Sequence, residues 1–260
     1  MEILWKIENL KKIYEVKSEF AKKKVVAIDG VSFEIYKGET FGIIGESGSG
    51  KTTLGKTIIR LIEPTEGKIF FRNTDISEMK ETHLRPLRKK FQIIFQDPYK
   101  SLNPRINALR TVMEGMDEKL KMKEKREKAE YLLSLVGIKK ERINNFPHQF
   151  SGGERQRIAI ARALSTDPEF IVCDEPTSNL DLSIQAQILN LFLELREKLN
   201  LTYLFITHDI KVMKYISDRV GVMYKGKIVE IGKTEKVINS PSHPYTEKLI
   251  SSELKIHQIP

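Results

Sequence analysis

The stretch that decides the fold is Gly45-Glu46-Ser47-Gly48-Ser49-Gly50-Lys51-Thr52, followed by Thr53. It fits the pattern G-x-x-x-x-G-K-[ST], which marks a loop whose backbone N–H groups surround nucleotide phosphates. In that pattern the lysine contacts the β- and γ-phosphates, and the hydroxyl of the last residue binds Mg²⁺. The stretch predicts that residues 45–53 bind a nucleotide, that Lys51 also acts in catalysis, and that Thr52 is a metal ligand.

The sequence on either side of this loop supports the same prediction. Residues 40–44 form an apolar run typical of a buried strand, and residues 53–62 have the pattern of a helix. Glycine permits the backbone angles that such a loop needs, and a helix N-terminus adds partial positive charge facing the phosphates. A Gly/Ser-rich surface turn is the alternative, and the strand–loop–helix order disfavours it.

Composition limits the class of protein. The 260 residues can bury a large core, and no apolar run approaches the roughly 18 residues that span a bilayer. The first six residues lack a charged-then-apolar signal segment, which favours a cytosolic protein. The single cysteine, Cys173, excludes an internal disulfide and a cysteine-built metal site, and is predicted to lie in the core.

The net charge of +9 leaves the partner undecided. A basic protein can bind nucleic acid, an anionic membrane surface or an acidic protein. Much of the excess lies in two short runs, 22–24 and 119–128, which are expected to be solvated surface. Charge therefore does not decide the function.

Apolar runs divide the chain into strand-rich and helical parts. Strands are predicted at 3–7, 12–16, 25–28, 67–71, 91–95, 170–173 and 203–206, and a hairpin at 220–224 and 227–231. Residues 17–24 are expected to form an exposed hairpin tip. Helical spacing replaces strand runs between 97 and 164 and returns at 183–198. The pattern predicts an α/β fold with a helical insertion.

Two carboxylates follow the buried strand at 170–173. Asp174, at the C-terminal end of the strand, is placed to hold Mg²⁺ through water beside the phosphate loop. Glu175 could polarise a water for in-line attack on the γ-phosphate. A strand followed by an acidic turn is common, and the presence of the phosphate loop favours the catalytic interpretation.

Gln96 and His208 also follow buried strands. The Gln96 amide could reach Mg²⁺ or the attacking water from a hinge, and a neutral His208 imidazole could hydrogen-bond the γ-phosphate. A lone glutamine or histidine after a strand is more often structural. The functional interpretation of Gln96 and His208 therefore rests on their occurrence together with the phosphate loop and the two carboxylates. Ser151-Gly152-Gly153-Glu154 precedes the helical run 157–164 and forms a second anion site, which the chain could use itself or offer to a partner.

In this order, the motifs resemble the ATP-binding subunits of ABC transporters over nearly the whole chain. The resemblance rests on the phosphate loop, Gln96, the signature 151–154, Asp174-Glu175, the loop 178–181 and His208. It implies a P-loop NTPase core, made of a parallel sheet with flanking helices and an N-terminal antiparallel β subdomain. That core would occupy 1–96 and 165–240 of an ATPase domain 1–240, with a helical insertion at 97–164 and a short tail at 241–260.

The resemblance also implies a hydrolytically competent site that uses ATP and Mg²⁺. Two subunits would enclose two ATP molecules head to tail, each phosphate loop facing the partner's Ser151-Gly152-Gly153-Glu154. Glu154 stands where the family most often has glutamine. Asp181 would couple the two sites, and Tyr14 would stack on adenine. The implied catalytic residues are Lys51, Gln96, Glu175 and His208, and the implied metal ligands are Thr52, Gln96 and Asp174.

Three further segments, 96–105, 184–189 and His243-Pro244-Tyr245-Thr246, resemble the oligopeptide/dipeptide importer subfamily. That subfamily also contains nickel and oligosaccharide importers. The resemblance implies a peripheral subunit on the cytoplasmic face of the membrane, with two integral membrane permease subunits docked near 97–104. A second ABC ATPase subunit and an extracytoplasmic solute-binding protein complete the expected partners, and a heterodimer is favoured over a homodimer.

Two other functions compete with import. A soluble ABC ATPase acting on nucleic acid or ribosomes would fit the basic charge, but the chain has no second cassette and no long coiled-coil or zinc insertion. No nucleic-acid partner is therefore expected. An exporter cassette is disfavoured by the importer-like segments.

Overall fold

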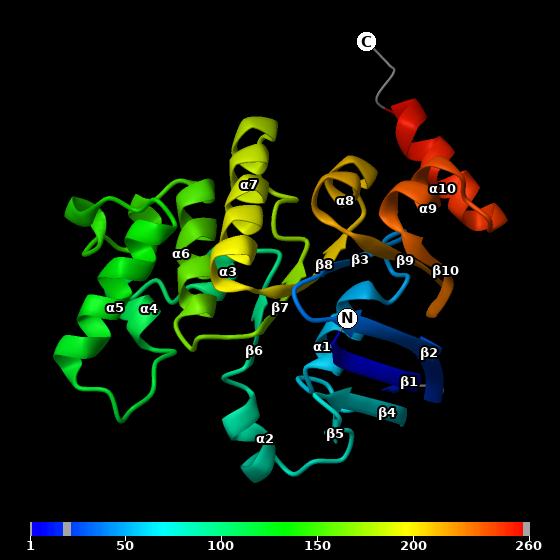
Figure 1. Ribbon diagram of the computed structural model, residues 1–260, viewed down its shortest axis with the longest axis horizontal. Helices are drawn as coiled ribbons and strands as arrows, with labels where there is room; N and C mark the ends of the chain where they lie inside the picture. The colour runs from blue at the N-terminus through cyan, green and yellow to red at the C-terminus, as the bar shows by residue number, and fades with distance from the viewer. Residues whose placement is uncertain (1, 18–21, 257–260) are drawn as a thin grey trace. The chain divides into compact units, whose positions relative to one another are not determined.

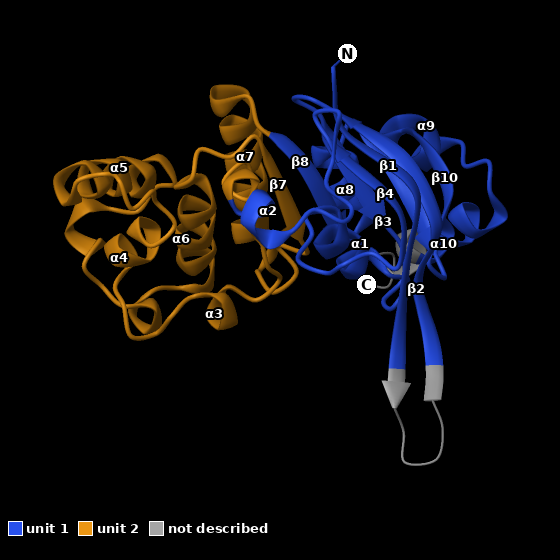
Figure 2. Ribbon diagram, turned by 90° about the horizontal axis from the view of Figure 1, so that it is seen from below, with its two compact units in different colours: residues 1–85, 202–260 blue, residues 86–201 orange. Residues whose placement is uncertain are grey.

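The computed structural model describes residues 2–17 and 22–256, which form two compact units (Figure 2). Unit 1 is Met1–Arg85 with Thr202–Pro260, and unit 2 is Pro86–Leu201. The helix α2 (Glu81–Leu87) contains the point where the chain passes from one unit to the other. The predicted insertion, 97–164, lies within unit 2 in sequence, and its boundaries stay a prediction.

An antiparallel sheet in unit 1 has the strand order β2-β1-β4-β5 (Figure 1). Its strands are β1 (Ile3–Lys17), β2 (Lys22–Tyr36), β4 (Glu66–Phe71) and β5 (Thr74–Asp75). Trp5 is fully buried and its ring lies 4.9 Å from that of Phe71. The packing of these rings anchors β1 to the core through β4.

The two separate strands predicted at 3–7 and 12–16 are one strand. Two of the register shifts in the β1–β2 pairing lie between Ile7 and Lys12, where Asn9 has a φ of 47°. The Asn9 N–H donates to the Ser32 hydroxyl at 2.8 Å. The polar break in the apolar pattern is therefore a β-bulge and not a turn. Residues 18–21 of the predicted hairpin tip lie outside the described residues.

The second set of strands in unit 1 has the order β10-β9-β3-β8. The strands are β3 (Thr40–Ile44), β8 (Thr202–Thr207), β9 (Arg219–Tyr224) and β10 (Lys227–Lys233), and the helices of this part are α1 (Lys51–Ile58), α8 (Ile210–Ile216), α9 (Thr234–Asn239) and α10 (Pro244–Ile256). β3 pairs in parallel with β8 and β9, while β10 pairs antiparallel with β9. All five residues of β3 are buried, as expected for a central parallel strand.

Unit 2 combines a parallel strand pair with helices. Its strands are β6 (Phe91–Ile94) and β7 (Phe170–Asp174), and its helices are α3 (Pro98–Ser101), α4 (Ala108–Met113), α5 (Met122–Leu135), α6 (Gly152–Leu164) and α7 (Leu182–Leu199), with short 3-10 turns at Lys140–Arg142 and Pro147–Gln149. α6 packs against α3, α4, α5 and β6. The predicted α/β fold with an antiparallel β subdomain is confirmed.

Two predicted boundaries differ from the structure. The helix predicted at 53–62 is α1, which ends at Ile58. Arg60 takes a left-handed φ of 55°, and its guanidinium donates to the Ile76 carbonyl at 3.0 Å and to the Met79 carbonyl at 3.2 Å. These contacts hold the chain away from the helix axis. The segment expected to be a short tail contains α10, whose Leu249 and Ile250 are buried in the core.

Candidate active site

The phosphate loop, residues 45–52, joins β3 to α1 in unit 1 and depends on closely packed glycines. A Cβ atom added to Gly45 would lie 2.2 Å from the Met223 carbonyl oxygen, and one added to Gly50 would lie 2.2 Å from the Ala27 carbonyl oxygen. Gly50 also has a φ of 108°, which L-residues rarely adopt. Glycine is therefore required at both positions for this loop path.

Two polar groups inside the loop fit a phosphate ligand. The Lys51 side chain is 5% exposed, and its ammonium donates to the carbonyls of Gly45 at 2.7 Å and of Glu46 at 2.9 Å. The Ser49 hydroxyl is buried and has no hydrogen-bond partner within the described part of the chain. The N-terminus of α1, with its partial positive charge, lies at the same place. The Lys51 charge and the buried Ser49 hydroxyl together suit an anionic oxygen.

Of the other two candidates in unit 1, His208 lies directly after β8 and Tyr14 lies on β1. His208 is exposed and follows Thr207, which pairs with Ile44, the residue before the loop. Tyr14 is half-buried on β1 and pairs with Val25, two residues before Ala27. The Lys12 ammonium lies 5.1 Å from the centre of the Tyr14 ring. The roles predicted for Tyr14 and His208 stay predictions.

In unit 2, the structure brings together two residues that were predicted to act in catalysis. The Gln96 side-chain amide donates to a Glu175 carboxylate oxygen at 2.9 Å, and also approaches the Ser178 hydroxyl at 3.4 Å. Glu175 follows β7 with a φ of 46°, in the left-handed region. Such a backbone angle on a non-glycine residue costs about 1–3 kcal/mol and is concentrated at functional sites. The structure therefore holds the Gln96 amide against the Glu175 carboxylate, and the catalytic roles predicted for both residues stay predictions.

Asp174 ends β7 and is only 5% exposed. Burial, followed by the charge of Asp174, raises the pKa of the adjacent Cys173 thiol well above its ordinary value. Cys173 is fully buried, as predicted, and stays a neutral thiol. The predicted metal ligands are Thr52, Gln96 and Asp174, which offer the oxygen donors that Mg²⁺ prefers.

Within the described ranges, no group of three or more His, Cys, Asp or Glu side chains could hold a metal ion. Mg²⁺ bound together with phosphate and water needs only one or two carboxylates from the protein. The donor chemistry of Asp174, Gln96 and Thr52 therefore fits that mode, and their role as metal ligands stays a prediction.

The signature residues form the capped N-terminus of α6. The Ser151 hydroxyl accepts a hydrogen bond from the Glu154 N–H at 3.3 Å, and the Glu154 carboxylate accepts one from the Ser151 N–H at 2.9 Å. Arg142 forms an ion pair with the same carboxylate. Ser151 and Gly152 are exposed, whereas Gly153 is buried against Ile184. Glu154, which differs from the usual glutamine, is thus bound by an arginine that no sequence motif identified.

Asp181 is the N-cap of α7, where its carboxylate accepts a hydrogen bond from the Ile184 N–H at 3.0 Å. It is exposed, and the next residue, Leu182, is 83% exposed. The carboxylate therefore has a local structural role beside the coupling role predicted for it.

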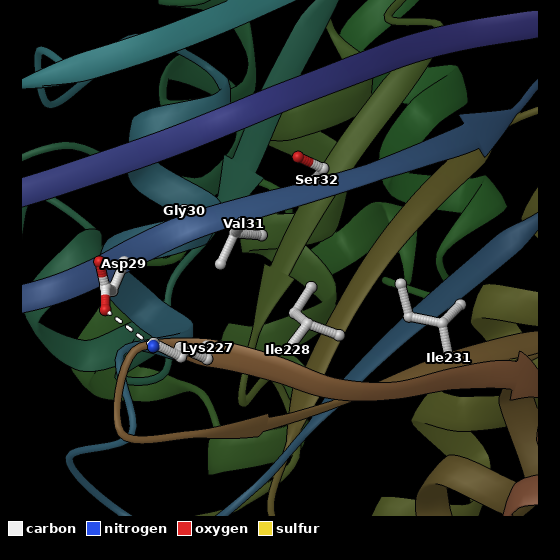
Figure 3. A pocket seen from close by; sticks show the side chains of 7 residues that line it. All are labelled: Asp29, Gly30, Val31, Ser32, Lys227, Ile228 and Ile231. Atoms are coloured by element: carbon white, nitrogen blue, oxygen red, sulfur yellow. Dashed lines mark ion pairs between the residues drawn. The ribbon is translucent and has the colours of Figure 1, made fainter.

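A separate hollow of about 450 Å³ lies in unit 1 between β2 and β10 (Figure 3). It is lined by Asp29, Gly30, Val31, Ser32, Lys227, Ile228 and Ile231, with an ion pair of 3.3 Å between Lys227 and Asp29. None of the predicted site residues lines it.

Among the helices that the structure describes, none has the length and apolar character of a membrane-spanning segment.

Comparison with known proteins places these features in one family. Residues 28–178 match the model of the ABC transporter family, and residues 229–258 match that of the oligopeptide/dipeptide transporter C-terminal region. The oligopeptide transport ATP-binding protein AppF of Bacillus subtilis is 50% identical over 96% of this chain and 78% of its own length. The oligopeptide transport ATP-binding protein OppF of Streptococcus mutans is 52% identical over 94% of this chain and 82% of its own length. The dipeptide transport ATP-binding protein DppF of Lactococcus lactis is 50% identical, over 93% and 81%.

Solved structures agree with this similarity. A dimeric ATP-binding cassette in a post-hydrolysis state, bound to ADP and phosphate, aligns with a TM-score of 0.79 at 31% identity, over 88% of this chain and 98% of that one. An ABC transporter cassette in its ADP conformation aligns with a TM-score of 0.81 at 29% identity, over 97% and 100%. These similarities confirm the resemblance that the motifs indicated.

Proposed function

The chain belongs to the ABC transporter family of ATP-binding proteins, and from that membership we propose that it is the ATP-hydrolysing subunit of an importer for oligopeptides or dipeptides. ABC cassettes bind ATP and act as ATPases, so the phosphate loop described above is assigned to ATP. The solute, the partners and the residue roles are the parts of the proposal that need testing.

The hydrogen bond between Gln96 and Glu175 carries the proposal that this chain hydrolyses ATP itself. Glu175 accepts the proton of the attacking water, while the Gln96 amide orients its carboxylate. Lys51 holds the β- and γ-phosphates in place of the two loop carbonyls that it now contacts. His208 donates to the γ-phosphate, and Tyr14 stacks on adenine. Thr52, Gln96 and Asp174 would hold Mg²⁺, which would neutralise charge that develops on the phosphate oxygens.

A second ATPase subunit is proposed as a direct partner. The N-terminus of α6 begins at the exposed residues Ser151 and Gly152 and would present helix N–H groups to a phosphate of the partner's ATP. Leu182, 83% exposed beside Asp181, gives this surface an apolar contact. Both features support a partner chain that brings its own ATP to the signature, and a heterodimer is proposed.

The permease contact is proposed at the start of α3. The Asp97 carboxylate accepts hydrogen bonds from the N–H groups of Tyr99 at 2.9 Å and Lys100 at 3.3 Å, which fixes the turn after Gln96. The Tyr99 ring is 61% exposed and lies 5.0 Å from the Arg155 guanidinium. An exposed aromatic ring three residues after Gln96 suits a contact that relates the catalytic cluster to two membrane subunits. The chain is therefore proposed to act at the cytoplasmic face of the membrane.

Peptides are proposed as the solute because the C-terminal region matches the oligopeptide/dipeptide transporter model and because the similar proteins are named as peptide transporters. An extracytoplasmic solute-binding protein would deliver the peptide to the permease. Nickel and oligosaccharide remain the alternative solutes, and nucleic acid is not proposed as a partner.

Purification of the chain from its native membranes tests the assembly. Two integral membrane proteins and a second ATPase in the purified complex would support the proposal, whereas recovery with ribosomes or DNA from the soluble fraction would contradict it. The complex, reconstituted in vesicles with its solute-binding protein, is expected to take up labelled di- or oligopeptides when ATP is supplied. A complex that takes up nickel or an oligosaccharide instead would contradict the peptide assignment.

A further inference from the structure

The segment His243-Pro244-Tyr245-Thr246 contacts the phosphate loop, although it lies about 200 residues away in sequence. It begins α10, which the oligopeptide/dipeptide C-terminal model includes and which is drawn in red in Figure 1. Tyr245 packs against a buried cluster that contains Ile44 and Leu249. Ile44 is the last residue of β3 before the loop, so α10 and the loop are supported by the same core.

Glu230 fixes the start of this segment. Its two carboxylate oxygens accept hydrogen bonds from the N–H of Ser242 at 2.8 Å and of His243 at 3.1 Å. Burial opposes the charge of Glu230, but the nearby Thr246 hydroxyl and these two N–H groups outweigh it and lower the pKa of the carboxyl. The Tyr245 N–H then donates to His243 Nδ1 at 3.1 Å. The backbone around Tyr245 is therefore held by a charged group on β10.

The Tyr245 side chain connects this anchor to the loop. Its ring stacks on that of Tyr224, with 4.0 Å between the centroids and 29° between the planes. Its hydroxyl oxygen accepts a hydrogen bond from the Glu46 N–H at 3.3 Å. The β9–β10 hairpin contacts the same loop, because the Gly226 N–H donates to the Ser49 carbonyl at 2.9 Å. The loop is thus held at Glu46 by Tyr245 and at Ser49 by the β9–β10 hairpin.

We propose that Tyr245 is a positioning residue that fixes the phosphate loop for ATP through the N–H of Glu46. The inference rests on the proposed function and assigns a role to the C-terminal segment of that same site. Loop residues 46–48 are exposed, and a loop that is ordered before its ligand arrives loses less entropy on binding. The hydrogen bond between Tyr245 and Glu46 therefore raises ATP affinity, although Tyr245 does not touch the reacting atoms. Any partner that displaces α10 would weaken ATP binding.

The experiment compares Tyr245→Phe with the wild type in the assembled transporter complex. Phenylalanine keeps the stack on Tyr224 and removes only the oxygen that accepts from Glu46. We expect the Kd and the KM for ATP to rise about fivefold, the ratio expected for one neutral hydrogen bond, with kcat and the thermal midpoint nearly unchanged. Tyr224→Phe, which removes a hydroxyl from the other ring of the stack, is the matched control and should leave all four values near those of the wild type.

Three results would overturn the inference. Tyr245→Phe with wild-type Kd and KM, tighter ATP binding by that variant, or an equal loss in Tyr224→Phe would each show that the hydroxyl does not position the loop. Glu230→Gln provides an independent variant. It weakens the hydrogen bonds that hold the start of α10, and should therefore raise the KM for ATP as Tyr245→Phe does. Failure of the proposed function gives a different signature, since the wild-type complex itself would then neither bind nor hydrolyse ATP.

Discussion

The variants Gly48→Ala and Gly50→Ala test whether packing, and not glycine flexibility alone, fixes the phosphate loop. Both glycines have left-handed backbones, with φ of 78° and 108°. A Cβ atom in that region costs about 1–2 kcal/mol. At Gly48 the added atom would meet nothing within 4 Å, so the backbone term is the whole expected loss.

Gly50 adds a clash to the same backbone cost. Its new Cβ would lie 2.2 Å from the Ala27 carbonyl oxygen and 2.8 Å from the Met223 methyl carbon. The methionine can move, but the carbonyl belongs to β2 and can shift only with the strand. Overpacking of this kind costs about 1–3 kcal/mol. Gly50→Ala is therefore expected to lose about 2–5 kcal/mol, roughly twice the loss of Gly48→Ala.

Urea unfolding of both variants, followed by circular dichroism with and without ATP, measures this difference. The wild type should gain stability from saturating ATP, because ligand binding to the folded state alone shifts the unfolding equilibrium. Gly50→Ala should show the lower midpoint in the absence of ATP and little gain in its presence. Equal losses in the two variants would refute the reasoning, since the contact with Ala27 would then contribute nothing.

Three further changes probe the groups around the site. Lys51→Ala removes the charged donor of the phosphate loop and should weaken ATP binding about 10- to 100-fold, as measured by titration calorimetry; unaltered affinity would contradict its role. Glu175→Gln should retain ATP affinity, lower kcat at least about 100-fold and trap the closed dimer on gel filtration; near-normal hydrolysis would remove Glu175 from general-base catalysis. The folded-state pKa of Glu230 lies below its ordinary value of 4.5, so its stabilising contribution is complete above that pH and is lost as the pH falls through the lower value. In an acid titration of the thermal midpoint, the wild type should therefore lose stability more steeply than Glu230→Gln, and parallel curves would show that the carboxylate does not anchor α10.

Local chemistry made part of this fold predictable. The phosphate loop, β3 and β7 were found because glycine spacing and continuous apolar runs have few alternative structures. The continuity of β1 was not predicted, because Asn9 and its neighbours look like a turn in the sequence. In the structure the Ser32 hydroxyl on β2 accepts the Asn9 N–H and keeps these residues in the strand. The end of α1 likewise depends on two carbonyls in residues 76–79 that attract Arg60. Tertiary contacts overrode the local pattern in both places.

The candidate site shows the same division. Sequence order could nominate Gln96 and Glu175 separately, but their hydrogen bond joins residues 79 positions apart. Nothing in the sequence pointed to Arg142 as the partner of Glu154, because an arginine in a polar stretch carries no pattern. Tyr245 was visible as part of a subfamily segment, yet its contact with Glu46 depends on how α10 packs on the core. Motifs identify the reacting groups, and the groups that hold them become visible only in three dimensions.

Alanine substitutions are unsuitable for testing the dimer roles of Ser151 and Asp181, because both residues already cap helices within a single chain. Each accepts a hydrogen bond from an N–H three residues on, and loss of such a cap costs about 1 kcal/mol with no partner present. An alanine at either position would therefore weaken the fold and the dimer together, and the two effects could not be told apart. Asparagine at Asp181 caps a helix about as well as aspartate but carries no charge. Any loss of coupling in Asp181→Asn would then belong to the carboxylate charge, and an unchanged dimer would leave Asp181 with its structural role alone.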